Sequence, residues 1–558
     1  MRRRFCWVAA VLCLQGGWCA LSRAESFTTN IISGVSTNAG TYFILGDTGS
    51  MNYLEINNGG SLGCVYATIG NTLPASNNTA LVTGTNSTLA AANGFGFESA
   101  GNSLIVSNGG VLTVPIASYV GDEQGANNNL VLLTGSGSVW NSGSLVIGYH
   151  GIANQVQVLN GAELLNTGGV ILGAEISSNN ALVVMGSKSR LITSGRLFMG
   201  EGGSGNQLAL SGGASFTCAS AQVGGAGNVI NVTGSNTVWR NTGSLDLGYC
   251  CGGSNQLTID AGAVVSNTTV SVGDDPISGN NRLVVAGPGT VWHNRDFYFG
   301  SSSNNTLLVT NGATVYSSVV IDIGDGSGAN NNTVVVTGTN TVWSNSGSLV
   351  VGRSGSSGNQ MQILDGAAVV SNTSVWVSES INSALIVDGA NSLLTSSGTF
   401  VVGGFGPGNQ FTLSGGATFI SAGAWVGDSS NVVLITGGNT VWNNNGSLQF
   451  GYCCGNNNQL VISAGAAVND GGCTISTSSN SILVDGTGTI WNTGWISIAD
   501  YTSGDLLVLT NGATVNCMGI QGGPGNDLIY QMIITGSNTI CNASTMTVGS
   551  EYFSDLLP

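Results

Sequence analysis

The chain has 558 residues, of which 88 are glycine and only 7% are charged, against about 25% in an ordinary soluble domain. This composition excludes an ordinary helical or α/β enzyme, and seven prolines without a Gly-X-Y register exclude collagen. A hydrophobic fraction of 42% argues against wholesale disorder, so the composition, with a formal net charge of −16, indicates an ordered, acidic β protein.

The first 24 residues read as a secretory signal peptide. Three arginines at 2–4 precede an apolar stretch over 5–14, and a small-residue cleavage site ends at Ala24, with Ala20 as the second choice. The apolar stretch is shorter than the roughly 20 residues of a membrane span. We therefore expect no membrane span and an exported protein that begins at residue 25.

Without residues 1–24, which hold four arginines and no acidic residue, the net charge is −20. Lys188 is the one lysine in the sequence. A surface this acidic repels phosphate backbones and anionic lipids, because both need clustered basic side chains. Nucleic acid is therefore excluded as a partner.

A repeat of about 25 residues fills the chain and occurs in two alternating forms, typified by 127–153 and 154–178. The pair recurs from residues 179, 228, 280, 330, 382, 431 and 480, at intervals of 49 to 52 residues. The motif Gly-Tyr-Cys-Cys-Gly occurs at 248–252 and again 203 residues later at 451–455. These intervals indicate growth by duplication, with a longer duplication of about eight units superimposed on the short repeat.

Two columns of residues mark the register of the repeat. Asn-Gln opens the second form at Asn154, Asn206, Asn255, Asn359, Asn409 and Asn458. Tryptophan recurs in the first form at Trp140, Trp239, Trp292, Trp343, Trp442 and Trp491, and leucine replaces it at Leu191 and Leu394.

Each unit offers three short strands of valine, leucine, isoleucine and threonine, separated by glycine, asparagine and serine, and no helical periodicity. One unit cannot bury its apolar face alone, whereas stacked units can. The sequence therefore predicts an all-β fold: a parallel, right-handed β-helix or solenoid of about 21 coils that forms one domain over 25–550. With strands about 4.8 Å apart the coils would form a rod on the order of 100 Å long, with asparagine ladders at the corners. Residues 551–558 would be the C-terminal end, which could be truncated. A β-propeller with 50-residue blades is the alternative fold.

Segments such as TGTNTVWSNSGSLVVG (337–352) and LLVTNGATVYSS (307–318) resemble the repeats in passenger regions of bacterial autotransporters. The resemblance covers about residues 30–550 and implies a secreted or surface-exposed β-solenoid that is adhesive or structural. Two features depart from that pattern: the sequence carries no C-terminal translocator barrel, and it has nine cysteines after residue 24.

Nine cysteines follow the signal peptide and are candidates for disulfides or a metal site: Cys64, Cys218, Cys250, Cys251, Cys453, Cys454, Cys473, Cys517 and Cys541. An odd number leaves at least one thiol unpaired. Cys250-Cys251 and Cys453-Cys454 are too far apart in the repeat to bridge each other, but each pair could form a vicinal disulfide, and Cys517 with Cys541 is the best bridge between adjacent coils. We expect no metal site, because His150, which shares the column of Cys250, lies four coils away.

Aspartates at glycine-rich corners are candidate calcium ligands. Aspartate also favours turns by bonding its own backbone, so its presence at these corners does not require calcium. They stand at Asp122, Asp274, Asp275, Asp325 and Asp428. Residues 522–530 fit one copy of the calcium nonapeptide of β-roll toxins, and such a site needs consecutive copies. No cofactor is therefore expected.

The function predicted from these patterns is a non-enzymatic, adhesin-like rod at the bacterial cell surface or outside the cell, with surface glycans, extracellular matrix, other cells or further copies of itself as partners. One alternative is a polysaccharide lyase or hydrolase, which needs carboxylates clustered on one face across successive coils. His150, His293 and Lys188 stand in no catalytic motif, so no catalytic residue is predicted. The other alternative is a carbohydrate-binding solenoid in which an outward-facing tryptophan column stacks on sugars.

Overall fold

The computed structural model describes residues 19–21, 25–452, 455–498, 503–522 and 531–547. Most of the predicted signal peptide and all of residues 551–558 lie outside these ranges, so those predictions stay open. Throughout the described ranges the secondary structure is β-strand with turns, and no helix in them is long and apolar enough to cross a membrane.

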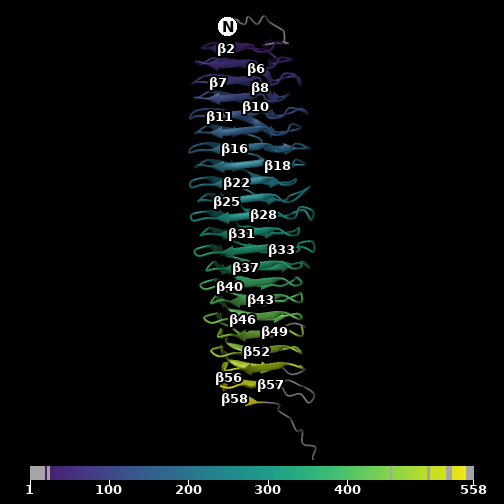
Figure 1. The fold of residues 1–558 in the computed structure, drawn as a ribbon, viewed down its shortest axis with the longest axis vertical. Coiled ribbons are helices and arrows are strands. Elements are labelled where there is room, and N and C mark those ends of the chain that lie inside the picture. Colours follow the sequence, from purple (N-terminus) through teal and green to yellow (C-terminus); the bar gives the residue numbers. More distant parts are fainter. Residues whose placement is uncertain (1–18, 22–24, 453–454, 499–502, 523–530, 548–558) are drawn as a thin grey trace, which may run out of the picture. The chain divides into compact units, whose positions relative to one another are not determined.

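The chain divides into two compact units, residues 1–283 with 289–292 and residues 284–288 with 293–558. Each unit is a parallel β-solenoid in which successive turns stack on one another (Figure 1). Within each unit the strand ladders are parallel and join residues about 25 positions apart, as in Ile105 with Leu132 and Val335 with Gln362. The solenoid prediction is confirmed. The propeller alternative is wrong, because its blades consist of antiparallel strands.

A typical turn holds three strands, such as β13 (Gln155–Leu159), β14 (Glu163–Asn166) and β15 (Val170–Ala174). The first strand of each turn belongs to one sheet, sheet B, and the other two belong to sheet A. In the early turns the second and third strands merge into a single long one, and these are β6 (Ser61–Ile69), β8 (Thr88–Phe97), β10 (Val111–Val120) and β12 (Val139–Ile147).

Sheet B has 21 strands in the described part of the chain, which matches the predicted number of coils. In the first unit they are β2 (Thr29–Ser33), β5 (Tyr53–Asn57), β7 (Thr79–Thr83), β9 (Ser103–Ser107), β11 (Leu130–Thr134), β13, β16 (Ala181–Met185), β19 (Gln207–Ser211), β22 (Val229–Thr233) and β25 (Gln256–Asp260). In the second unit they are β31 (Thr306–Thr310), β34 (Thr333–Thr337), β37 (Gln360–Leu364), β40 (Ala384–Asp388), β43 (Gln410–Ser414), β46 (Val432–Thr436), β49 (Gln459–Ser463), β52 (Ser481–Asp485), β55 (Leu506–Thr510) and β57 (Gln531–Ile534). The remaining strand, β28 (Arg282–Ala286), has residues in both units.

Strict alternation along each strand builds the core. In β11 the second and fourth residues, Val131 and Leu133, are fully buried, whereas Leu130, Leu132 and Thr134 face outward. Successive side chains of a strand point to opposite faces, so every turn contributes the same two inward positions. Stacked in register, these positions form continuous aliphatic columns through each unit.

A buried asparagine ladder runs along one corner, as the sequence predicts. The side-chain oxygen of each asparagine accepts a hydrogen bond from the backbone N–H of its counterpart one turn earlier, at 2.8–3.1 Å in the first unit. In the second unit Ser383 and Asp505 take two of the positions. The ladder satisfies backbone donors that a corner would otherwise leave buried and unpaired.

A second corner of the turn uses an Asn-Gly pair with both residues in the left-handed region. Asn311 has φ 56° and Gly312 has φ 79°, and Asn108 with Gly109 repeats this geometry. Asparagine and glycine tolerate positive φ better than other residues, which explains their abundance here.

Candidate functional site

The tryptophan column faces inward. Trp140, Trp239, Trp292, Trp343, Trp442 and Trp491 have no exposed surface. Leu191 and Leu394 are equally buried, and Leu191 pairs in register with Phe216, which pairs with Trp239. The column is therefore core packing, and the alternative in which these tryptophans stack on sugars is wrong.

The outer face of sheet B in the first unit carries no charge across seven consecutive described strands, β7 to β22. Its middle column begins with Leu81, Ile105 and Leu132, which pair in register and are partly exposed. Threonine, serine, glutamine and small aliphatic residues flank this column.

The second unit repeats this arrangement. Five consecutive aliphatic residues form the middle column from β46 to β57, in register from strand to strand: Leu434, Val461, Leu483, Val508 and Ile533. Among the outward positions of β31 to β55, the charges are Asp388 and Asp485, each at the last position of its strand. We refer to these two surfaces, of which the first carries no charge and the second carries Asp388 and Asp485, as the outer faces of sheet B.

Most of the corner aspartates make local turn hydrogen bonds. The backbone N–H of Ser429 donates to Asp428 Oδ1 at 2.7 Å, and that of Ile277 donates to Asp275 Oδ1 at 3.0 Å. The Ser271 hydroxyl donates to Asp274 at 3.3 Å. Among the residues that the structure describes, no group of three or more His, Cys, Asp or Glu side chains could hold a metal ion. Residues 523–530 of the nonapeptide-like segment lie outside those residues.

The two histidines have separate surroundings. His150 Nδ1 lies 2.9 Å from the backbone oxygen of Asp122, and its Nε2 lies 3.5 Å from Glu175 Oε2. His293 stacks on Tyr316 with ring centroids 4.9 Å apart. Each histidine is thus engaged by its own neighbouring turns, and Lys188 occupies an exposed turn with φ 69°.

A charged cluster that sequence reasoning missed lies in the second unit. Arg353 Nη1, at the end of β36 (Ser348–Arg353), donates to Asp322 Oδ2 at 2.8 Å, and Arg353 Nε lies 3.8 Å from Glu379. Burial raises the pKa of Asp322 to about 7 despite the opposing effect of Arg353, because the Asp322 side chain has no exposed surface. These residues follow one another at about one repeat length, which is the signal that could have revealed them. Since Asp322 is fully covered, it cannot touch a substrate.

Among the residues that the structure describes, no cysteine forms a disulfide. The side chains of Cys517 and Cys541 hydrogen-bond to each other, so the predicted pair on adjacent turns does come together. Burial, followed by the neighbouring Cys541, raises the pKa of Cys517 to about 11. Cys250 and Cys251 are also in contact, whereas Cys453 and Cys454 lie outside the described residues.

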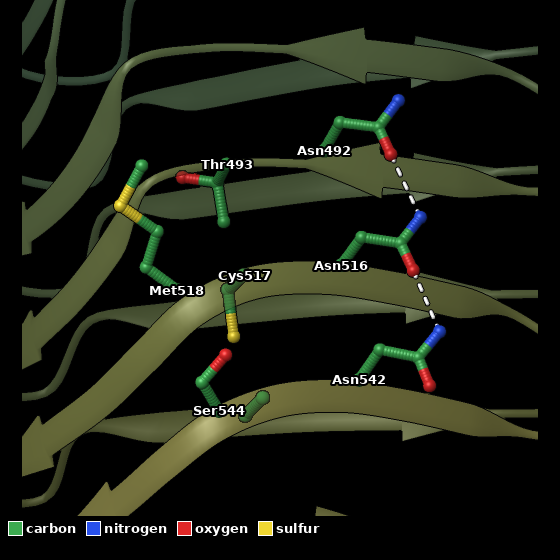
Figure 2. Close-up of a pocket in the computed structure, with 8 residues that line it drawn as sticks. Asn492, Thr493, Asn516, Cys517, Met518, Asn542 and Ser544 are labelled. Carbon is green, nitrogen blue, oxygen red and sulfur yellow. Dashed lines mark hydrogen bonds between the residues drawn. The ribbon is translucent and has the colours of Figure 1, made fainter.

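An exposed asparagine ladder borders a shallow groove of about 640 Å³ in the last described turns. Figure 2 shows Asn492, Asn516 and Asn542 in a row, with Cys517 and Met518 across the groove. The Asn516 amide donates to Asn492 and the Asn542 amide donates to Asn516, both at 2.8 Å. Because these amides bond chiefly to one another, the ladder stabilises the stack of turns rather than presenting free recognition groups.

Comparison with known proteins gives little beyond the fold. No protein family model and no curated protein matches the chain. Among the solved structures that match is a TibC-catalysed hyper-glycosylated fragment of TibA, with 12% identity and a TM-score of 0.26. The alignment covers 68% of this chain and 97% of the fragment.

Proposed function

We propose that the chain is an exported, adhesin-like structural solenoid of the bacterial autotransporter passenger type, located at the cell surface or outside the cell. It acts by lateral contact with surfaces or with further copies of itself, and it carries no catalytic centre. The observation that carries this proposal is the aliphatic and threonine-rich outer face of sheet B in each unit, which carries no charge in the first unit and two aspartates in the second.

These faces suit association because contact desolvates no charge in the first unit and, in the second, meets charges at Asp388 and Asp485, each at the end of its strand. Burying an unpaired charge is costly, whereas burying apolar side chains is favourable by about 25 cal/mol per Å². An acidic chain repels its own copies wherever its carboxylates meet, so a face with few charges is a surface through which copies can approach.

The size of the faces also supports the proposal. With about 3.3 Å per residue and 4.8 Å between strands, β7 to β22 offer about 500 Å² and β31 to β55 about 700 Å². A standard specific interface buries about 800 Å² on each partner. Each face therefore approaches the area that specific association needs.

Introducing a charge into each outer face of sheet B tests the proposal. Leu132→Lys and Val335→Lys place a charge in the middle column of each face. Both positions are partly exposed and point away from the core, so core packing is unchanged. Asn141→Lys and Ser344→Lys are matched controls, since both residues face outward from sheet A in the same turns. We expect the first pair to reduce self-association in sedimentation velocity and attachment to bacterial cells, with the controls behaving like the wild type. Equal behaviour of all four variants would contradict the proposal.

Export is tested separately by expressing the full chain in a Gram-negative bacterium and locating it by fractionation and by protease treatment of intact cells. Processing after Ala24 with recovery of the protein at the surface or in the medium is the expected result. An unprocessed chain confined to the cytoplasm would refute the export part of the proposal without bearing on the faces.

A further inference from the structure

A groove of about 410 Å³ crosses three consecutive turns of the first unit, on the outside of β6, β8 and β10. Tyr66 of β6 and Tyr119 of β10 supply aromatic rings to its lining, and β8 lies between them. Tyr66 is 40% exposed and stacks on Tyr42 of the preceding turn, with ring centroids 5.5 Å apart. Tyr119 meets Tyr149 of the following turn edge-on at 6.3 Å. Neighbouring turns thus hold both rings in place.

The floor of the groove is glycine. Gly94 pairs with Tyr66 and with Ala117, and Gly96 pairs with Thr68 and with Tyr119, so the central strand presents no side chain where its neighbours do. Neither glycine has a positive φ, and a Cβ added at Gly96 would meet only the Tyr119 backbone oxygen at 3.8 Å. The backbone conformation at position 96 does not require glycine. The absence of a side chain at Gly96 therefore serves to keep the groove open. Glycine within a strand is typical of a place where a ligand approaches the backbone closely.

Polar groups line the groove beside the rings. Glu98 follows β8 and Asp122 follows β10, and both side chains are only partly exposed. Burial, followed by the charges of Asp122 and Glu123, raises the pKa of Glu98 to about 7, so its carboxyl both donates and accepts hydrogen bonds near neutral pH. Asn93, whose amide donates to the Tyr66 hydroxyl at 3.3 Å, and Thr68 add uncharged donors and acceptors.

We propose that this groove, which we call the tyrosine groove, is a binding site for an uncharged saccharide chain. Aromatic rings pack against the C–H faces of pyranose rings, while carboxyl, amide and hydroxyl groups bond to the sugar hydroxyls, and a glycine floor lets the chain lie against the sheet. The carboxylates Asp122 and Glu123 repel anionic polysaccharides. A polycation is disfavoured because ten of the twelve lining residues carry no charge.

This inference goes beyond the proposed function, since the tyrosine groove lies on sheet A and its test does not depend on the outer faces of sheet B. The full chain is run through native gels containing dextran, mannan, starch or mixed-linkage β-glucan. Gels with polygalacturonate and with polylysine serve as the anionic and cationic comparisons. Retardation in at least one neutral polysaccharide is expected.

Three variants locate the binding. Gly96→Val fills the floor without a backbone clash, and Tyr119→Ala removes one ring. The matched control is Gly423→Val, because Gly423 lies within β45 (Gly423–Gly427), lacks a positive φ, and offers an added Cβ only the Ser447 backbone oxygen at 3.8 Å. We expect the two groove variants to bind about tenfold more weakly, as loss of one aromatic contact implies, with the control unchanged.

The outcomes are distinct. Retardation by a neutral polysaccharide that Gly96→Val and Tyr119→Ala weaken about tenfold and Gly423→Val leaves unchanged would support the proposal. Absence of retardation in every neutral gel, or retardation that survives Gly96→Val and Tyr119→Ala, would overturn it. Preferential retardation by polygalacturonate or polylysine would overturn the assignment of an uncharged ligand. As a control for folding, the circular dichroism spectrum and thermal unfolding of Gly96→Val are compared with those of the wild type. If both are unchanged, a loss of binding is caused by the change in the groove.

Discussion

Asn458 Oδ1 accepts two hydrogen bonds from Asn431, one from its backbone N–H at 3.0 Å and one from its side-chain amide at 3.1 Å. Asn458 in turn donates to the backbone oxygen of Asp428 at 2.7 Å, and the residue has no exposed surface. One side chain thus links consecutive turns and satisfies buried donors on its neighbour. Replacing it removes an acceptor that water cannot replace.

We expect Asn458→Ala to lower the free energy of unfolding by about 2 to 4 kcal/mol, since it leaves the buried Asn431 backbone N–H without a partner and the Asn431 amide with the Gly427 backbone oxygen alone. The matched control is Asn516→Ala in the exposed ladder, where water can replace the lost bonds and the expected change is below about 1 kcal/mol. Urea unfolding followed by circular dichroism measures both. Equal losses for the two variants would show that burial does not set the cost.

The stability of the second unit should depend on pH through Asp322. Its pKa is about 7 in the folded protein, against an ordinary value of 3.8, so the folded state keeps the proton at a pH where the unfolded state has lost it. The proton therefore stabilises the fold at low pH, and this contribution is lost as the pH rises from about 4 to about 7. The urea midpoint of Asp322→Asn should fall less over this interval than that of the wild type.

Asp365→Asn serves as the control for the pH experiment, because Asp365 occupies an exposed turn with φ 55°, a conformation that asparagine also adopts. Its profile should follow that of the wild type. If Asp322→Asn kept the full pH dependence, another group would be responsible.

The buried tryptophans should differ in their tolerance of phenylalanine. Trp343 Nε1 donates to the Ser317 hydroxyl at 3.0 Å, whereas Trp140 Nε1 is buried without a hydrogen-bond partner. Both substitutions remove similar volume, but only Trp343→Phe breaks a hydrogen bond. We expect Trp343→Phe to cost about 1 kcal/mol more than Trp140→Phe in urea unfolding. The reverse order would contradict this assignment.

Cys517 and Cys541 should form a disulfide when the protein meets a thiol oxidant such as diamide, because their side chains are already in contact. The pKa of Cys517 is raised to about 11 and that of Cys541 is also raised, so little thiolate exists near neutral pH. The rate of bridging should therefore increase with pH, since the thiolate is the reactive form. Peptide mapping after alkylation detects the bridge, and the separately buried Cys218 and Cys473 should remain reduced. Failure to bridge at high pH would show that the two thiols do not approach closely enough in solution.

The repeat in the sequence determined the architecture of this protein. Units of 25 residues with short aliphatic strands cannot bury their apolar face alone, so stacking into a parallel solenoid follows from the pattern. The corner asparagines were predictable for the same reason: a residue type that recurs once per turn forms a ladder when the turns stack. The predicted contact between Cys517 and Cys541 follows from their positions in adjacent repeats.

The tertiary structure decided which residues face inward and which residues of different turns meet. Alternation along a strand defines two faces but does not say which face is the core, and this is why Trp140 could be placed inside only once the fold was known. The ion pair of Asp322 with Arg353 and the shared groove of Tyr66 and Tyr119 belong to no local motif, because each depends on the exact register of separate turns. Depth of burial likewise raises the pKa of Asp322 and of Glu98, and it depends on what the neighbouring turns place over each carboxyl.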